Sequence, residues 1–141
     1  MNLYLDASAL VKRYIAEESS EQVNAWIGEA DLVVTSLITR VEVAAAIARA
    51  RRMKIIASDE SDAALHQFRS EWESFQRLSI TENTVIRGDL LACEHDLRGY
   101  DATHLACALI WQESLDLPVT LATFDGQLAK AAKDVKIEIL A

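Results

Sequence analysis

The sequence predicts an α/β fold with a central, mostly parallel sheet and helices on both of its faces. Short apolar or β-branched runs recur along the chain, and a segment with helical periodicity separates each run from the next. Strands joined through helices run parallel, and a parallel sheet is covered on both faces. Because the chain has 141 residues with only four glycines and one proline, we expect one domain that spans residues 1–141.

The predicted strands are short runs that are apolar, β-branched or alternating: residues 2–5, 32–35, 78–80, 119–123 and 136–140. The run at 119–123 is continuously apolar and follows Pro118, so it is expected to be a buried strand. The run at 78–80 gives the weakest strand signal.

The predicted helices occupy the segments between these runs: residues 9–14, 20–28, 37–53, 59–77, 82–97, 101–111 and 127–133. Ser8 and Ser36 stand where a hydroxyl side chain can cap the first and third of these helices. Apolar residues recur every three or four positions along 59–77, which indicates an amphipathic helix. Residues 102–111 carry no Asp, Glu, Lys or Arg, so this helix is expected to lie in the core.

Composition indicates a folded protein of the cytoplasm. Hydrophobic residues make up 51% of the chain and charged residues 26%, which is typical of a compact domain. We see no signal peptide and no apolar stretch of the roughly 18 residues that a membrane span needs, so no membrane role is expected. Cys93 and Cys107 lack metal-binding spacing and are predicted to be small buried residues in a reducing compartment.

The charge is acidic overall and basic in one segment. A formal net charge of −8 argues against a binder of any polyanion, because Lys and Arg supply most of that affinity. From Arg40 to Lys54, however, five basic residues accompany one acidic residue, a local net charge of +4. This segment is compatible with a nucleic-acid substrate, and the acidic remainder is compatible with a basic protein partner.

Four acidic residues are far apart in the sequence: Asp6, Glu42, Asp101 and Asp125. Asp6, Asp101 and Asp125 lie where predicted elements begin or end, and Glu42 lies about two turns into the predicted helix that follows the second strand, near the same edge of the sheet. In parallel α/β sheets ligands bind beyond the carboxyl ends of the strands, so we expect the four side chains to converge there. Converging carboxylates repel one another and need a cation between them. Taken singly, Asp6 could end a strand in a local turn, and helix capping is the more common explanation for either Asp101 or Asp125.

Glu42 is the acid that local structure explains least well. It shares a helix face with Ala45 and Ala46, which cannot solvate a carboxylate. Burial without a partner is costly, so Glu42 needs a shifted pKa, an arginine from elsewhere in the chain, or a metal.

The acids and their neighbours form a set of hard oxygen ligands. Ser8 lies near Asp6 and Thr123 lies near Asp125, so their hydroxyls are candidates for orienting the carboxylates. Such a set favours Mg²⁺ or Mn²⁺. The histidines have no zinc spacing; His66 and His95 are predicted to be exposed, and His104 is predicted either to lie in the core or to support the acids.

Four blocks of the sequence resemble, in order, the PIN-domain proteins, and specifically the VapC-type toxins of toxin–antitoxin pairs. The blocks are residues 3–12, residues 36–46 with Glu42, residues 98–106 with Asp101, and residues 123–132 with Asp125. The resemblance extends over the whole chain, and it is the four blocks together that make it specific.

The resemblance implies a three-layer α/β/α fold and a metal-dependent endoribonuclease whose catalytic and metal-binding quartet is Asp6, Glu42, Asp101 and Asp125. It also implies Mg²⁺ or Mn²⁺ as cofactor, a cognate VapB-type antitoxin as partner, and a homodimer. The acidic net charge departs from what broad RNA binding needs and favours a narrow RNA substrate.

Two other functions remain open on the residues alone. Phosphoaspartyl enzymes also begin with an aspartate after the first strand, but they carry a second one two residues later, where this chain has Ser8. A catalytically inactive PIN-like module that binds RNA or protein would use the same acids as caps and ion pairs. Stabilisation by a divalent cation distinguishes the enzyme from this module.

Overall fold

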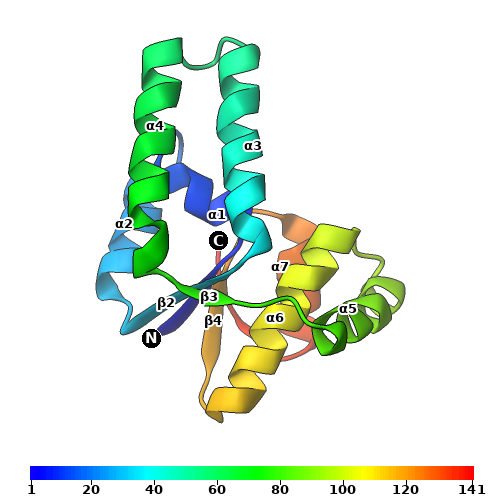
Figure 1. Cartoon of the computed structure of the whole chain (residues 1–141). Helices are drawn as coiled ribbons and strands as arrows, with labels where there is room; N and C mark the ends of the chain where they lie inside the picture. The colour runs from blue at the N-terminus through cyan, green and yellow to red at the C-terminus, as the bar shows by residue number, and fades with distance from the viewer.

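A single parallel sheet organises the chain, and the computed structural model describes all of residues 1–141. Its strands are β1 (Asn2–Leu5), β2 (Leu32–Ser36), β3 (Gln76–Leu78), β4 (Val119–Ala122) and β5 (Glu138–Leu140). They are ordered β3-β2-β1-β4-β5 and every neighbouring pair is parallel. The predicted α/β class with a mostly parallel sheet is therefore confirmed, and β1 lies at its centre (Figure 1).

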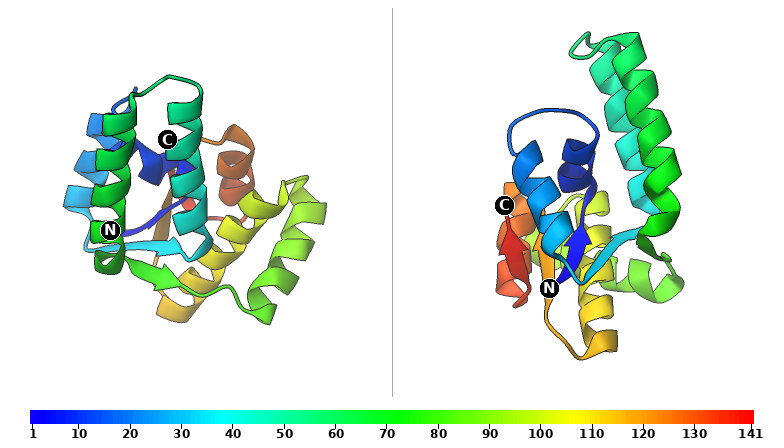
Figure 2. Two further views of the ribbon diagram at one scale, coloured as in Figure 1. Left: turned by 45° about the horizontal axis from the view of Figure 1, so that its top comes forward. Right: turned by 90° about the vertical axis from the view of Figure 1, so that its left-hand side faces the viewer.

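Helices cover both faces of the sheet. The α-helices are α1 (Ala7–Leu10), α2 (Ser20–Glu29), α3 (Ile38–Arg52), α4 (Ser58–Glu71), α5 (Glu82–His95), α6 (Gly99–Leu115) and α7 (Gly126–Asp134), and the 3₁₀ turns are η1 (Val11–Arg13) and η2 (Trp72–Ser74). Helices α5, α6 and α7 pack on one face, and α1 to α4 pack on the other (Figures 1 and 2).

Strand periodicity divides the core into two clusters. On β1, Leu3 and Leu5 enter the cluster beneath α1 to α4, whereas Tyr4 enters the cluster beneath α6. All three side chains are fully buried. Because both layers depend on the same central strand, the predicted three-layer arrangement is confirmed at the level of side-chain packing.

Helices α3 and α4 form a hairpin that rises beyond the sheet, and α3 is the member nearer to α6 and α7 (Figure 1). The right-hand view of Figure 2 shows how far the hairpin extends past the other helices. At its base Arg40 places its guanidinium 5.7 Å from the ring centroid of Trp72. No helix of the protein is both long and apolar enough to cross a bilayer.

Two predicted helix caps are wrong. Ser8 was expected to cap the first helix, but Asp6 has the extended backbone and accepts the amide hydrogen of Ala9, so it is the N-cap of α1. Ser36 was expected to cap the third helix, but it ends β2, and α3 begins behind Leu37 without a side-chain cap. At the first place the helix begins two residues earlier than the hydroxyl pattern indicated, and at the second both the end of the strand and the start of the helix lie one residue later.

The helix predicted at 59–77 ends early. α4 stops at Glu71, η2 follows, and the backbone becomes extended at Phe75, whose side chain is buried. The tighter 3₁₀ turn keeps Trp72 and Phe75 in the core without a further α-helical turn. As a result β3 begins at Gln76, two residues before the predicted strand.

Two burial predictions on α5 are also wrong. Cys93 is exposed, whereas Cys107 on α6 is buried as predicted. His95 was expected to be exposed but is half-buried at the end of α5, near Asp134. On this helix Leu91 faces the core, and Cys93 lies on the opposite side.

Candidate metal and catalytic site

The site begins where two adjacent strands end. Leu5 of β1 is in register with Ala122 of β4, and the backbone N–H of Asp6 donates to the carbonyl of Ala122 over 3.3 Å. Parallel pairing therefore puts Asp6 beside Thr123, although 116 residues separate them in the sequence. This is the convergence of strand ends that the sequence predicted for Asp6.

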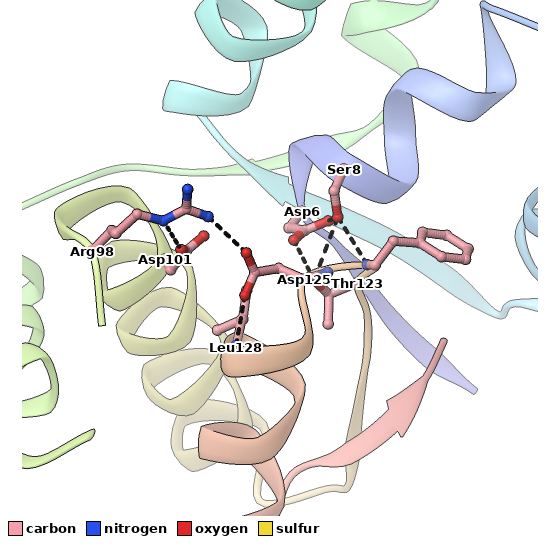
Figure 3. Close-up of polar contacts among 8 residues, drawn as sticks. Asp6, Ser8, Arg98, Asp101, Thr123, Asp125 and Leu128 are labelled. Carbon is pink, nitrogen blue, oxygen red and sulfur yellow. Dashed lines mark hydrogen bonds and ion pairs between the residues drawn. The ribbon is translucent and has the colours of Figure 1, made fainter. Parts of the chain in front are cut away.

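Asp6 is buried, with an exposed fraction of 3%, and three donors hold its carboxylate. Oδ1 accepts from the Ser8 hydroxyl at 2.7 Å and from the Ala9 amide at 2.9 Å, and Oδ2 accepts from the Thr123 hydroxyl at 2.6 Å. A carboxylate oxygen has two lone pairs, so Oδ2 keeps one acceptor position unused. Figure 3 shows the Ser8 and Thr123 side chains beside Asp6.

Burial raises the pKa of Asp6, and the nearby His104 and the donated hydrogen bonds only partly oppose that effect. No Lys or Arg forms an ion pair with this carboxylate. A buried carboxylate with a fixed orientation and one unused lone-pair position is suited to binding a cation.

Ser8 and Thr123 orient Asp6 and also brace the turn between β4 and α7. The Ser8 hydroxyl accepts from the backbone N–H of Phe124 at 2.9 Å, and the Thr123 hydroxyl accepts from that of Asp125 at 3.1 Å. Thr123, expected to support the Asp125 carboxylate, instead donates to Asp6 and reaches Asp125 through its backbone.

Asp125 has two roles. Its Oδ1 accepts from the Leu128 amide at 2.9 Å and caps α7, as one interpretation of the sequence expected. Its Oδ2 accepts from Nη2 of Arg98 at 2.7 Å. Capping thus fixes the carboxylate and leaves its second oxygen directed toward the site (Figure 3).

Asp101 lies across Arg98 from Asp125. It is in the first turn of α6, which begins at Gly99 and not at Asp101, and it forms no capping hydrogen bond. Its Oδ2 accepts from Nε of Arg98 at 3.0 Å. Burial and the negative charge of Asp125 raise the pKa of Asp101, although Arg98 lowers it. The two carboxylates are therefore close enough to repel each other, and the Arg98 guanidinium lies between them.

Glu42 is held by a histidine and not by an arginine. Its Oε1 lies 2.6 Å from Nε2 of His104, and Nδ1 of the same ring lies 2.8 Å from the hydroxyl of Tyr4. His104 is 1% exposed. Because a carboxylate only accepts, Nε2 carries a proton, and in the neutral ring Nδ1 accepts the Tyr4 hydroxyl. Burial raises the pKa of Tyr4, so that hydroxyl stays protonated.

These contacts connect all four acids, though not around one point. Asp6, Thr123, Asp125, Arg98 and Asp101 form a continuous series of contacts, and Glu42 joins it through His104, one helical turn after Asp101. No three Asp, Glu, His or Cys side chains lie close enough together to share one ion. Asp101 and Asp125 are instead both paired with the guanidinium of Arg98.

The residues fit a hard divalent cation by their chemistry. All the candidate ligands are carboxylate oxygens, which Mg²⁺ and Mn²⁺ prefer. The Arg98 guanidinium is a stand-in positive charge that marks the place between Asp101 and Asp125 as one that takes a cation. Its side chain is 74% exposed, so it can leave without disturbing the core.

Sequence reasoning missed two parts of this site. Arg98 bridges Asp101 and Asp125, and nothing in its local sequence pattern indicated this. The link from Tyr4 to His104 had a usable signal, because Tyr4 alternates with Leu3 and Leu5 and His104 lies on an otherwise apolar helix. A polar group on each facing surface indicates that the two are paired.

Comparisons with known proteins bear on the family and the fold of the chain. The profile of the PIN domain family matches residues 3–134. Ribonuclease VapC45 of Mycobacterium tuberculosis is 34% identical over 76% of this chain and 74% of its own length. Ribonuclease VapC3 of Pyrobaculum aerophilum is 30% identical over 92% of this chain and 94% of its own.

Among solved structures, a toxin–antitoxin complex from Klebsiella pneumoniae contains a chain that superposes with a TM-score of 0.67. The two chains are 19% identical, and the match covers 100% of this chain and 97% of that one. At this identity the likeness concerns the fold.

Proposed function

The chain belongs to the PIN-domain family, and from this premise we propose that it is a VapC-type toxin: a divalent-metal-dependent endoribonuclease of the cytoplasm. The observation that carries the proposal is the buried Asp6 carboxylate, which three donors fix in orientation. Asp101 and Asp125 repel each other and share one guanidinium, so their charges also call for a cation. The relatives named as VapC ribonucleases support RNA as the substrate.

In the proposed function Asp6, Asp101, Asp125 and Glu42 are the residues that would hold Mg²⁺ or Mn²⁺. When bound, such an ion lowers the pKa of a water molecule and neutralises charge on the phosphodiester. Asp6 offers the unused lone pair of Oδ2, and Ser8 and Thr123 keep it directed into the site. Asp125 offers the oxygen that now pairs with Arg98.

Arg98 and His104 act through the acids. Arg98 bridges Asp101 and Asp125 and offsets their mutual repulsion. A divalent ion held by these two acids would take over that role, and the guanidinium would then be free to contact a phosphate. His104 keeps the Glu42 carboxylate turned toward the site.

The first test measures RNA cleavage and metal binding together in an Asp6→Asn variant. The amide retains the size of the side chain but removes its charge, so cleavage of cellular RNA in Mg²⁺ should fall by at least about 100-fold. The rise in thermal midpoint that Mn²⁺ gives the wild-type chain should shrink as well. A variant that cleaves RNA at the wild-type rate would remove the proposal.

Arg98→Ala is the matched variant, and it should change the stabilisation by Mn²⁺ in the opposite direction. It removes the cation that competes for Asp101 and Asp125, so a given Mn²⁺ concentration should raise the thermal midpoint more than it does in the wild type. Circular dichroism of both variants controls for folding. If neither variant changes the response to Mn²⁺, the acids do not bind the ion.

A catalytically inactive module that binds RNA or protein is the second candidate. One observation favours it: no three candidate ligands are close enough to share an ion in the arrangement found. Such a module would show no stabilisation by Mg²⁺ or Mn²⁺ beyond that given by an equal ionic strength of NaCl.

We also propose a VapB-type antitoxin as inhibitor and a homodimer of the chain itself. The solved toxin–antitoxin complex from Klebsiella supports the first through its fold. Asp101 and Asp125 already accept one guanidinium, so an arginine on a partner could replace Arg98 there. Co-expression with a neighbouring small open reading frame should yield a stable complex, and size-exclusion chromatography that recovers the chain alone would contradict this.

A further inference from the structure

The basic residues of α3 are divided between two faces of the helix. Arg40 and Arg51 lie on the side toward α4, where Arg40 stands over Trp72 and Nη1 of Arg51 lies 3.7 Å from Oδ1 of Asp62. These two arginines stabilise the hairpin. Of the remaining two, Arg49 lies on the side of the helix opposite to Arg51. Arg52 lies between these sides and also lines a second hollow with Ala57 and Ser58 at the start of α4.

Arg49 is on the same face of α3 as the site acid Glu42. Seven residues, nearly two full helical turns, separate them, and Ala45 and Ala46 occupy the turn between. Arg52 follows one turn further along. At about 1.5 Å per residue, Arg49 is about 10 Å from Glu42 along the helix axis and Arg52 about 15 Å.

Arg49 and Arg52 are exposed, and neither takes part in an ion pair or a hydrogen bond of its side chain. Both line an open hollow together with Ala45, Ala46 and Met53. Because alanine side chains are short, an extended RNA strand can approach the backbone of α3 closely at this point. The hollow thus has cations at one end and the candidate active site beyond the other.

The helix dipole gives a simpler reason for basic residues here, because cations are favoured in the last turn of a helix. The dipole, however, favours a cation on any side of the last turn, and Arg51 interacts with it although its side chain pairs with Asp62. An acidic chain of net charge −8 gains little from general attraction to RNA, so phosphate contacts must be local.

We propose that Arg49 and Arg52 bind phosphates of the RNA strand beyond the scissile bond, so that the substrate runs along α3 from Glu42 toward the tip of the hairpin. The proposal rests on the function proposed above and adds where the substrate lies. Arg49 and Arg52 are positioning residues, because their distance from Glu42 keeps them away from the reacting phosphate. Their planar guanidinium groups suit phosphate oxygens.

The test measures RNA affinity as a function of salt in the presence of EDTA, so that cleavage plays no part. The probe is end-labelled total transfer RNA mixed with fragmented ribosomal RNA. The Arg49→Ala/Arg52→Ala variant should bind about 10-fold more weakly at about 50 mM salt, and the slope of log K against log salt should fall by about 0.7 for each arginine removed. Arg51→Ala, which removes the paired arginine of the same turn, is the control and should retain the wild-type slope.

A cleavage assay in Mg²⁺ separates this proposal from the proposed function. The double variant should raise KM with kcat nearly unchanged, because it loses binding that is equal in the ground state and the transition state. If the wild type cleaves RNA while the double variant keeps its salt slope and KM, the placement along α3 is wrong and the nuclease stands. The placement of RNA along α3 is also overturned if the wild-type chain has no affinity for RNA at low salt. It is overturned as well if the double variant keeps its affinity for RNA and loses only its affinity for an acidic protein partner.

Discussion

At the scale of single residues, one carboxylate can cap a helix and still lie in the candidate site. Asp6 and Asp125 are both helix N-caps, and both also lie in the candidate site. Each has two oxygens, and Asp125 uses one for the cap and the other for Arg98. The sequence presented capping and metal binding as alternatives, and geometry shows why a cap does not exclude a ligand.

His104 gives the sharpest test at this scale. Replacing it by Leu leaves Glu42 without its donor, so the affinity for Mn²⁺ should fall by about 10- to 100-fold. His104→Gln can still donate toward Glu42 and should restore most of that affinity. Titration of Mn²⁺ followed by the thermal midpoint measures both.

Tyr4→Phe is the control for burial alone, since it keeps the aromatic ring and removes only the hydroxyl that contacts Nδ1 of His104. It should lower stability by about 1 kcal/mol with a smaller effect on Mn²⁺. If His104→Leu binds Mn²⁺ as tightly as the wild type does, His104 is only a core residue.

At the scale of elements, Glu71 fastens the hairpin to the body of the protein. Its carboxylate accepts from Nε and Nη2 of Arg13 and from the hydroxyl of Tyr14, all on or beside η1. Burial alone would raise the pKa of Glu71, but the hydrogen bonds from Arg13, Gln67 and Tyr14 together outweigh it, and the pKa is lowered. None of these long-range contacts could be predicted from the sequence, because helical periodicity reports a face and not its partner.

The lowered pKa makes the contribution of Glu71 depend on pH. Since the folded-state pKa lies below the unfolded value of about 4.3, the stabilisation is complete above that pH and is lost as the pH falls through the folded pKa. Glu71→Gln should therefore cost about 1–2 kcal/mol at pH 7 and progressively less below about pH 4. Urea unfolding of the wild type and the variant, at pH 7 and at a pH below about 4, measures the difference in their free energies of unfolding.

Glu73→Gln is the matched control, because Glu73 is exposed two residues away and forms no side-chain ion pair. It should have little effect at either pH. If the cost of Glu71→Gln is the same at both pH values, the carboxylate charge does not hold η1 to α4.

At the scale of the whole molecule, the order of strands and helices could be predicted because alternation and helical periodicity are local signals. The site was predictable only in part. Parallel strands bring Asp6 to Thr123 by a general rule, but Arg98 and His104 take their places through the docking of α6. The ends of elements, such as Glu71 and Phe75, depend on which side chains find room in the core.

The division of the core predicts how the whole chain unfolds. Trp111 belongs to the cluster beneath α6, whereas Trp26 and Trp72 belong to the other cluster. Because Leu3, Tyr4 and Leu5 of one strand serve both clusters, loss of either layer exposes the strand that supports the other. We therefore expect the chain to unfold as one cooperative domain.

Two variants separate the signals of the layers. Trp111→Phe leaves fluorescence only in the layer of Trp26 and Trp72, and the double variant Trp26→Phe/Trp72→Phe leaves it only in the layer of Trp111. Within each variant, the urea midpoints from fluorescence and from far-UV circular dichroism should coincide, because the dichroism reports helices of both layers. If either variant shows two midpoints, the layers unfold separately, and the chain is not one cooperative domain.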